Sequence, residues 1–366
     1  MLLLNTMIPI SLIVSMELTK FFQALGIALD DLLVEGGQRA KVLNMLIHED
    51  LAKIDYIFAD KTGTLTTNEM KFISCSINGD VYLRHQLTRV YCLETNQQDS
   101  DLNQGDLTYH LFWLTLSLCH DVVIDRKIDS DNQLQVHYQG SSPDEVELVT
   151  AASEANYVFA DKKGEITSLK INGELRQFLL VNKIDFSSDR KRMSVIMRDM
   201  ESNKLYLFCK GADSMIIKRI KKDTNLEFLE KTQEDLKTFS KEGLRTLAIG
   251  YKELDDEEFM DWQIKYTQAQ QEEYNIMADM DPQAKLRALE EELERDLVLL
   301  GATALEDRLQ DGVAETITDL HKAQIKVWML TGDKLETAEN IGYSTNLLAQ
   351  DTKVFKVGTT NEEETL

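Results

Sequence analysis

The amino-acid sequence predicts an α/β protein that combines a parallel sheet with a large inserted α+β domain and one N-terminal transmembrane helix. Three observations lead to this fold class. Residues 1–27 are mainly apolar, and two short strand-like runs at residues 54–59 and 325–330 each end in a polar loop. The chain between these two runs is long enough to fold as a domain of its own.

The N-terminal apolar segment, Met1 to Leu25, would as a helix be long enough to cross about 30 Å of hydrocarbon. It has neither the basic start nor the small-residue cleavage site of a secretory signal. Pro9 leaves a backbone carbonyl unpaired within the segment, so we expect neighbouring helices from elsewhere to satisfy it. An amphipathic helix buried in a core is the alternative.

The two strand-like runs precede the loops DKTGTLT and TGD. A helical pattern follows the second loop as far as Leu347. In open parallel sheets, ligands bind at the carboxyl ends of the strands, so the two loops are expected to meet if the strands are neighbours.

Inside the insertion, β-like runs occur at residues 204–209 and 245–250, with helices between them. The acidic run from Glu253 to Asp261 and the helix-like stretch from Gln283 to Arg295 are expected to be solvated faces.

Composition excludes one class of partner. The 366 residues include 63 acidic and 40 basic side chains, which gives a formal net charge of -23. Binding to nucleic acid through a general basic surface is excluded, because it needs Lys and Arg to displace counterions from phosphates. The 4 cysteines are far apart in the sequence, which indicates neither a disulfide framework nor a zinc knuckle and fits a reducing compartment.

The loop DKTGTLT, residues 60–66, carries the clearest chemical signal. A carboxylate at the end of a strand, here Asp60 beside Lys61, can attack a phosphoryl group in line and form an aspartyl phosphate. Gly63 lets the backbone approach closely. Thr62 stands where a phosphatase of the haloacid dehalogenase type has a second Asp as general acid and base, so we expect an intermediate that persists until another event triggers its hydrolysis.

DKTGTLT resembles the phosphorylation signature of the P-type ATPases, and further blocks resemble the phospholipid-transporting branch of that superfamily, the type IV flippases. These blocks run from Pro9 to Gly342 and cover nearly the whole chain. They are PISL at residues 9–12, SPDE at 142–145, Phe186 with RKRMSVI at 190–196, KGAD at 210–213, GLRTL at 243–247, ALED at 304–307 with LQDGV at 309–313, and TGDK at 331–334.

The resemblance implies a phosphorylation domain with a haloacid dehalogenase-like Rossmannoid sheet, interrupted by a nucleotide-binding domain. The implied organisation is a transmembrane helix at 1–27 (part of the family's fourth helix), a connector at 28–52, the first part of the phosphorylation domain at 53–73, the nucleotide-binding domain at 74–297, and a truncated second part at 298–366. The family's GDGxND loop, its actuator domain with a DGET motif, and its other transmembrane helices are not found in this sequence. We therefore expect a fragment of the pump.

The resemblance also implies roles for the two strand-end loops. Asp60 would be the nucleophile and Lys61 would neutralise phosphate charge. Thr62 would offer its main-chain carbonyl, together with Asp60, to Mg²⁺, a cation that prefers oxygen ligands. Three residues of the second loop would hold phosphoryl oxygens or lie close to the nucleotide, namely Thr331, Gly332 and Asp333.

In the inserted domain, the resemblance implies that Phe186 stacks on adenine, with core packing as the alternative. Lys210 would lie along the nucleotide and Arg245 would reach its phosphates as a planar donor fork. Glu145 would bind polar groups of the base or ribose. Asp144 has a helix cap as its alternative role, and the basic cluster at 190–192 is expected to attract anions in part, with ordinary surface charge as the alternative.

The implied cargo is decided by the segment Pro9, Ile10, Ser11 and Leu12, the expected lipid path. Cation pumps of the superfamily carry a Glu after the corresponding Pro, whereas this chain has Ile10, so a phospholipid headgroup fits better than a bare cation. The implied function is ATP-driven phospholipid transport toward the cytoplasmic leaflet, by an integral membrane protein with cytoplasmic soluble domains and an accessory membrane subunit. A cation pump, an ATP-binding fragment that is catalytically incomplete, and a soluble phosphatase are the alternatives.

Overall fold

The computed structural model describes residues 10–35, 37–45, 50, 53–89, 104–128, 134–221, 226–273, 282–332, 335–349 and 352–355. The chain divides into two compact units. The first comprises Met1–Ala59 and Ala314–Leu330, and the second comprises Asp60–Val313 and Thr331–Leu366. The predicted α/β class is confirmed, because a parallel strand pair and a large antiparallel sheet with helices are both present.

The first unit begins with a long apolar helix, α1 (Ile10–Leu29). It is the one helix among the described residues that is long and apolar enough to span a membrane, with a mean hydropathy of 1.5 and only 6% of its apolar window buried. The hydroxyls of Ser15 and Thr19 donate to carbonyls four residues earlier, which satisfies these polar groups within the helix itself. Pro9 lies outside the described residues, whereas Ile10, Ser11 and Leu12 form the exposed first turn.

The remaining elements of the first unit are short. A two-stranded antiparallel ribbon of β1 (Val34–Glu35) and β2 (Gln38–Arg39) follows α1. β3 (Tyr56–Asp60) pairs with β15 (Lys326–Leu330), and α9 (Val313–Lys322) precedes β15.

β3 and β15 run in the same direction. The Lys326 N–H donates to the Asp55 carbonyl at 2.9 Å, and the rings of Phe58 and Trp328 lie 6.0 Å apart, so both strands advance in step. Consequently the residues that follow them, Asp60 and Thr331, leave the same end of this sheet. The two strands predicted at residues 54–59 and 325–330 are therefore neighbours.

The second unit contains a nine-stranded antiparallel sheet with the order β5-β4-β14-β13-β12-β11-β10-β9-β8. Its strands are β4 (Thr66–Ile77), β5 (Asp80–Leu83), β8 (Tyr157–Lys163), β9 (Ile166–Ile171), β10 (Glu174–Ile184), β11 (Arg192–Asp199), β12 (Leu205–Gly211), β13 (Arg245–Leu254) and β14 (Val298–Leu309). β12 and β13 confirm the two strands predicted inside the insertion. A separate hairpin consists of β6 (Val123–Ile128) and β7 (Leu134–Gln139).

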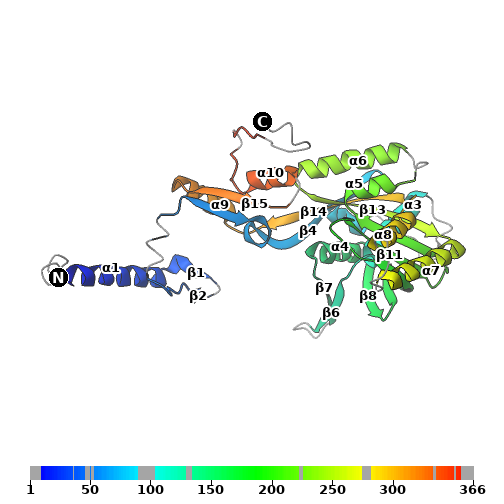
Figure 1. Ribbon diagram of the computed structural model, residues 1–366, viewed down its shortest axis with the longest axis horizontal. Coiled ribbons are helices and arrows are strands. Elements are labelled where there is room, and N and C mark those ends of the chain that lie inside the picture. Colours follow the sequence, from blue (N-terminus) through cyan, green and yellow to red (C-terminus); the bar gives the residue numbers. More distant parts are fainter. Residues whose placement is uncertain are drawn as a thin grey trace. The chain divides into compact units, whose positions relative to one another are not determined.

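Helices cover both faces of this sheet (Figure 1). They are α3 (Gln104–Leu118), α4 (Pro143–Glu154), α5 (Asp213–Ile216), α6 (Leu226–Lys241), α7 (Asp256–Glu273) and α8 (Pro282–Leu293). A further helix, α10 (Leu335–Ser344), packs against α6. Alternation along β11 separates two cores: Val195 belongs to a cluster with Trp113 of α3, and Ile196 belongs to a cluster with Trp262 of α7. Both faces of β11 are therefore buried, so successive residues of this strand are buried instead of every second one.

The predicted domain bounds stay a prediction. The bound at 73/74 falls inside β4, and the bound at 297/298 falls at the start of β14. These two long strands pair with each other along most of their length.

Candidate functional site

The loop after β3 has a fixed shape that exposes Asp60. The side chain of Asp60 is exposed, and Thr62 has an extended backbone with φ -77° and ψ 121°. Gly63 has φ +75°, a conformation that suits glycine. The Thr66 hydroxyl closes the loop, accepting from the Gly63 N–H and donating to the Lys61 carbonyl at 3.3 Å each. A solvent-accessible carboxylate therefore stands at the strand end, on a locally braced backbone.

Lys61 points away from solvent and into a buried ion pair. Its ammonium lies 2.8 Å from Oδ2 of Asp307 in β14, and the two side chains are only 1% and 5% exposed. The charge of Lys61 is thus compensated within the protein. Asp307 is not among the site residues predicted from the sequence, although it falls in the family-like block 304–307. Only its place beside Lys61 in the fold gives it a role.

The second loop follows β15. Thr331 is half-buried and Gly332 is exposed, while Asp333 lies outside the described residues. The parallel pairing of β3 and β15 brings Asp60 and Thr331 to the same strand ends, as expected from the strand pattern.

Oxygen atoms are the available ligands for a metal ion in the first loop. Among the described residues, no group of three or more His, Cys, Asp and Glu side chains is arranged to hold a metal. The Asp60 carboxylate and the Thr62 carbonyl are hard oxygen donors of the kind that Mg²⁺ prefers. The residues present therefore fit Mg²⁺ as a partial donor set.

A second constellation joins α4 to β12. The Lys210 ammonium donates to Oε1 of Glu145 at 2.7 Å, and the backbone N–H of Asp121 donates to Oε2 of the same carboxylate at 3.0 Å. Burial alone would raise the pKa of Glu145, but the Lys210 charge and the two hydrogen bonds together hold that pKa below its ordinary value. Glu145 is therefore an ionised acceptor at neutral pH.

Arg245 lies beside the same helix. Its Nη1 is 3.1 Å from Oδ1 of Asp144, and its side chain is 42% exposed. Ser142 is the N-cap residue of α4, with Pro143 at its start and the two acidic residues Asp144 and Glu145 in the first turn, where negative charge is favoured by the helix dipole. α4 thus presents the Glu145 carboxylate to Lys210 and the Asp144 carboxylate to Arg245.

Phe186 is 62% exposed, which excludes the core-packing alternative. It lines a cavity of about 410 Å³ together with Lys183, Arg190 and Tyr266. Lys183 links this cavity to the Glu145 constellation, because its ammonium lies 2.5 Å from the Asp121 carboxylate. An exposed ring beside a cavity suits stacking with a planar ligand.

The basic cluster at 190–192 corrects two sequence expectations. Arg190 and Arg192 both bind the fully buried carboxylate of Glu294, at 2.5 and 2.6 Å, and Arg190 also contacts Glu290 of α8. Arg190 and Arg192 are therefore paired within the fold and are not ordinary surface charge, while Lys191 is the exposed member of the cluster. The stretch 283–295 is likewise not simply a solvated face, since it supplies these buried glutamates.

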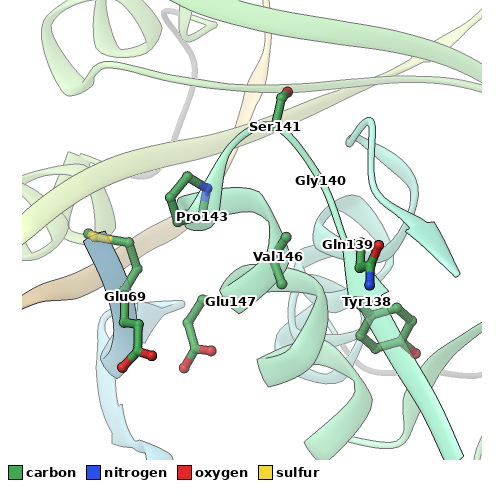
Figure 2. Close-up of a pocket in the computed structure, with 9 residues that line it drawn as sticks. Glu69, Tyr138, Gln139, Gly140, Ser141, Pro143, Val146 and Glu147 are labelled. Carbon is green, nitrogen blue, oxygen red and sulfur yellow. The ribbon is translucent and has the colours of Figure 1, made fainter. Parts of the chain in front are cut away.

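A larger cavity of about 640 Å³ lies at the start of α4. Figure 2 shows the side chains around it, with Glu69 from β4, Glu147 from α4, and Tyr138 and Gln139 from β7. Glu147 accepts from the Phe72 N–H at 2.8 Å. Two acidic side chains, Glu69 and Glu147, line this cavity, and none of the predicted site residues does.

Known proteins that are similar in sequence to this chain are P-type ATPases. The sequence profile of the P-type ATPase cytoplasmic domain N matches residues 109–312. The chain is 40% identical over 374 residues to the human phospholipid-transporting ATPase IC, covering 96% of this chain and 29% of that protein. It is 38% identical to mouse phospholipid-transporting ATPase FetA over 99% of this chain and 32% of that protein.

A fungal relative extends the comparison. The phospholipid-transporting ATPase dnf2 of Schizosaccharomyces pombe is 37% identical over 99% of this chain and 29% of that protein. The chain thus spans 29% to 32% of the length of these curated relatives. With a domain profile that matches more than half of its residues, and with the Glu145, Lys210 and Phe186 constellation inside the matched region, the chain belongs to the P-type ATPase family.

Proposed function

We propose that this chain carries the phosphorylated aspartate and the nucleotide-binding residues of a phospholipid-transporting ATPase. The observation that carries the proposal is the exposed Asp60 carboxylate at the end of β3, beside the neighbouring strand β15. The names of the relatives, which are phospholipid-transporting ATPases, supply the transported substance.

In the proposed reaction, a carboxylate oxygen of Asp60 attacks the γ-phosphorus of ATP. The new bond joins that oxygen to phosphorus, the bond between phosphorus and the β–γ bridging oxygen breaks, and ADP leaves with the electron pair. Water later attacks the same phosphorus, which releases inorganic phosphate and restores the carboxylate. Thr331 and the Gly332 N–H would hold phosphoryl oxygens, and Asp333 would lie close to the nucleotide.

The nucleotide would be held by residues of the second unit. Phe186 would stack on adenine, Lys210 and Arg245 would contact the phosphates, and Glu145 would accept hydrogen bonds from the base or ribose. The exposure of Phe186 and the closeness of Lys210 to Glu145 support this assignment.

Asp60 and the Thr62 carbonyl would contribute to binding Mg²⁺. When bound, Mg²⁺ neutralises charge on the transferred phosphoryl group. Lys61 would add positive charge next to the nucleophile, although its own charge is balanced by Asp307. The phosphate therefore depends on groups other than Lys61 for most of its neutralisation.

For transport, α1 would lie in a membrane, with the soluble units in the cytoplasm. Most of its apolar side chains are exposed, as a lipid-facing helix requires. The segment Pro9 to Leu12 would line the path of a phospholipid headgroup moving toward the cytoplasmic leaflet. An accessory membrane subunit would supply further contacts.

The test is acid-stable labelling of the detergent-solubilised chain by γ-³²P-labelled ATP with Mg²⁺. We expect label in the wild type that hydroxylamine removes, and no label in Asp60→Asn. Equal labelling of both proteins would refute the assignment of Asp60. ATP binding without labelling of the wild type would favour the ATP-binding fragment, and turnover stimulated by a cation instead of phospholipid would favour a cation pump.

A further inference from the structure

The turn after α3 contains a buried histidine that none of the roles above uses. His120 is 8% exposed, and its ring packs edge-on against Phe159 with centroids 4.8 Å apart. Its Nε2 lies 2.8 Å from the Ser117 carbonyl, and its Nδ1 lies 3.1 Å from the backbone nitrogen of Val122. Because a carbonyl only accepts and an amide N–H only donates, Nε2 carries the proton and Nδ1 accepts.

This tautomer does not titrate near neutral pH. Burial, followed by the positive charge of Lys210, lowers the pKa of His120 to about 4. The other charged groups that act on the ring are Glu145, whose charge raises the pKa of His120, and Lys162, whose charge lowers it. The ring is therefore a fixed pair of one donor and one acceptor.

The hydrogen bond from the Val122 N–H to Nδ1 closes a turn around Asp121. A side-chain acceptor at position i that binds the N–H at i+2 is the geometry of an Asx turn, here made by a histidine. Two polar groups of Asp121 contact residues around the proposed nucleotide site. Its backbone N–H donates to Glu145 at 3.0 Å, and its carboxylate accepts from Lys183 at 2.5 Å.

We propose that His120 is a positioning residue for the nucleotide site, because its ring holds the turn that aims the Asp121 N–H at Glu145, which in turn holds the Lys210 ammonium at 2.7 Å. The inference rests on the proposed function, in which Glu145 and Lys210 bind ATP. It assigns His120 no contact with the nucleotide and no proton transfer.

The chain offers matched variants that separate positioning from packing. His120→Leu removes both hydrogen bonds, whereas in His120→Asn the side-chain oxygen can still accept from the Val122 N–H. His120→Gln places its amide one carbon too far to close the same turn. His110→Leu is the packing control, because His110 is another buried histidine, within α3, that is 3% exposed and lies 2.8 Å from the Tyr157 hydroxyl.

The experiment measures ATP binding to the complete detergent-solubilised chain by titration calorimetry. The dissociation constant should rise about tenfold in His120→Leu, the scale of one hydrogen bond to a charged group. His120→Asn should stay within about twofold of the wild type, and His110→Leu should lower thermal stability without changing affinity. If His120→Leu does not fold, the comparison of His120→Asn with His120→Gln replaces it, and equal affinities of these two would overturn the proposal.

A double-variant cycle tests whether His120 acts through Glu145. If it does, His120→Leu should add nothing to the loss caused by Glu145→Gln. Additive losses, or an equal loss of affinity in His110→Leu, would overturn the proposal in favour of general packing. If Lys210→Ala weakens ATP binding but His120→Leu does not, only the proposal for His120 is overturned. If Lys210→Ala also leaves the affinity unchanged, the proposed nucleotide site is overturned as well.

Discussion

The buried ion pair next to the proposed nucleophile allows a quantitative stability prediction. Asp307→Ala removes the carboxylate that lies 2.8 Å from the Lys61 ammonium, a group only 1% exposed. Removing one partner of a buried pair leaves the other charge desolvated and costs about 3–5 kcal/mol. The neighbouring residue in β14 gives a matched control: Arg308 pairs with Glu69 at 3.5 Å, with side chains 57% and 69% exposed. Arg308→Ala should cost less than about 1 kcal/mol.

Urea unfolding followed by tryptophan fluorescence measures this difference. Trp113 is fully buried and lies 6.1 Å from the ring of Phe72 in β4, so its emission reports on the sheet that contains Asp307. Replacing both charges, in Lys61→Met with Asp307→Leu, should recover most of the lost free energy of unfolding, because no buried charge then remains. A loss in Asp307→Ala no larger than that in Arg308→Ala would show that water reaches the Lys61 ammonium, and the reasoning from burial would fail.

Three further predictions concern the nucleotide constellation and its surroundings. Phe186→Ala should weaken ATP binding by about 1–3 kcal/mol in calorimetry, the scale of a base stacked on an aromatic ring; unchanged affinity would remove Phe186 from the site. The pKa of Glu145 is lower in the folded state than in the unfolded state, so the ionised side chain stabilises the fold above its unfolded pKa, and this stabilisation is lost as the pH falls through the folded pKa. Glu145→Gln should therefore make the urea unfolding midpoint fall less steeply with decreasing pH, and a fall as steep as that of the wild type contradicts this. Gly243→Ala should cost about 1 kcal/mol or more, since φ is +81° and the new Cβ would lie 2.8 Å from the Asn340 Cβ; a thermal midpoint equal to the wild type speaks against it.

Short-range patterns in the sequence were sufficient to predict several strands. Apolar runs rich in β-forming residues locate β3, β12, β13 and β15 to within a few residues, because such runs are typical of strands whatever their partners. The exposure of Phe186 could not be derived from its own residue type, since phenylalanine is usually buried. It followed only from the family-like sequence around it.

The sequence did not allow us to predict which charged side chains form ion pairs with each other. Arg192 binds Glu294, and Lys61 binds Asp307, in each case across a long stretch of chain. A charged residue in the sequence looks the same whether it faces water or a buried partner. Only the register of the sheet and the packing of α8 decide which carboxylate meets which cation, and for this reason the pairing of Arg190 and Arg192 could not be predicted from the sequence.

The partners of the proposed phosphate-binding cations bear on how this acidic chain would bind the proposed nucleotide. Lys210 and Arg245 are paired with Glu145 and Asp144, two successive carboxylates in the first turn of α4. Such pairs hold long cationic side chains in place before the nucleotide arrives, which reduces the entropy lost on binding. They also cancel much of the local positive charge. The phosphates would therefore be held mainly by directed hydrogen bonds, and less by net electrostatic attraction. In the proposed site, stacking on Phe186 would then supply a large share of the affinity, and the site would select for a ligand that offers both an aromatic base and a polyanion.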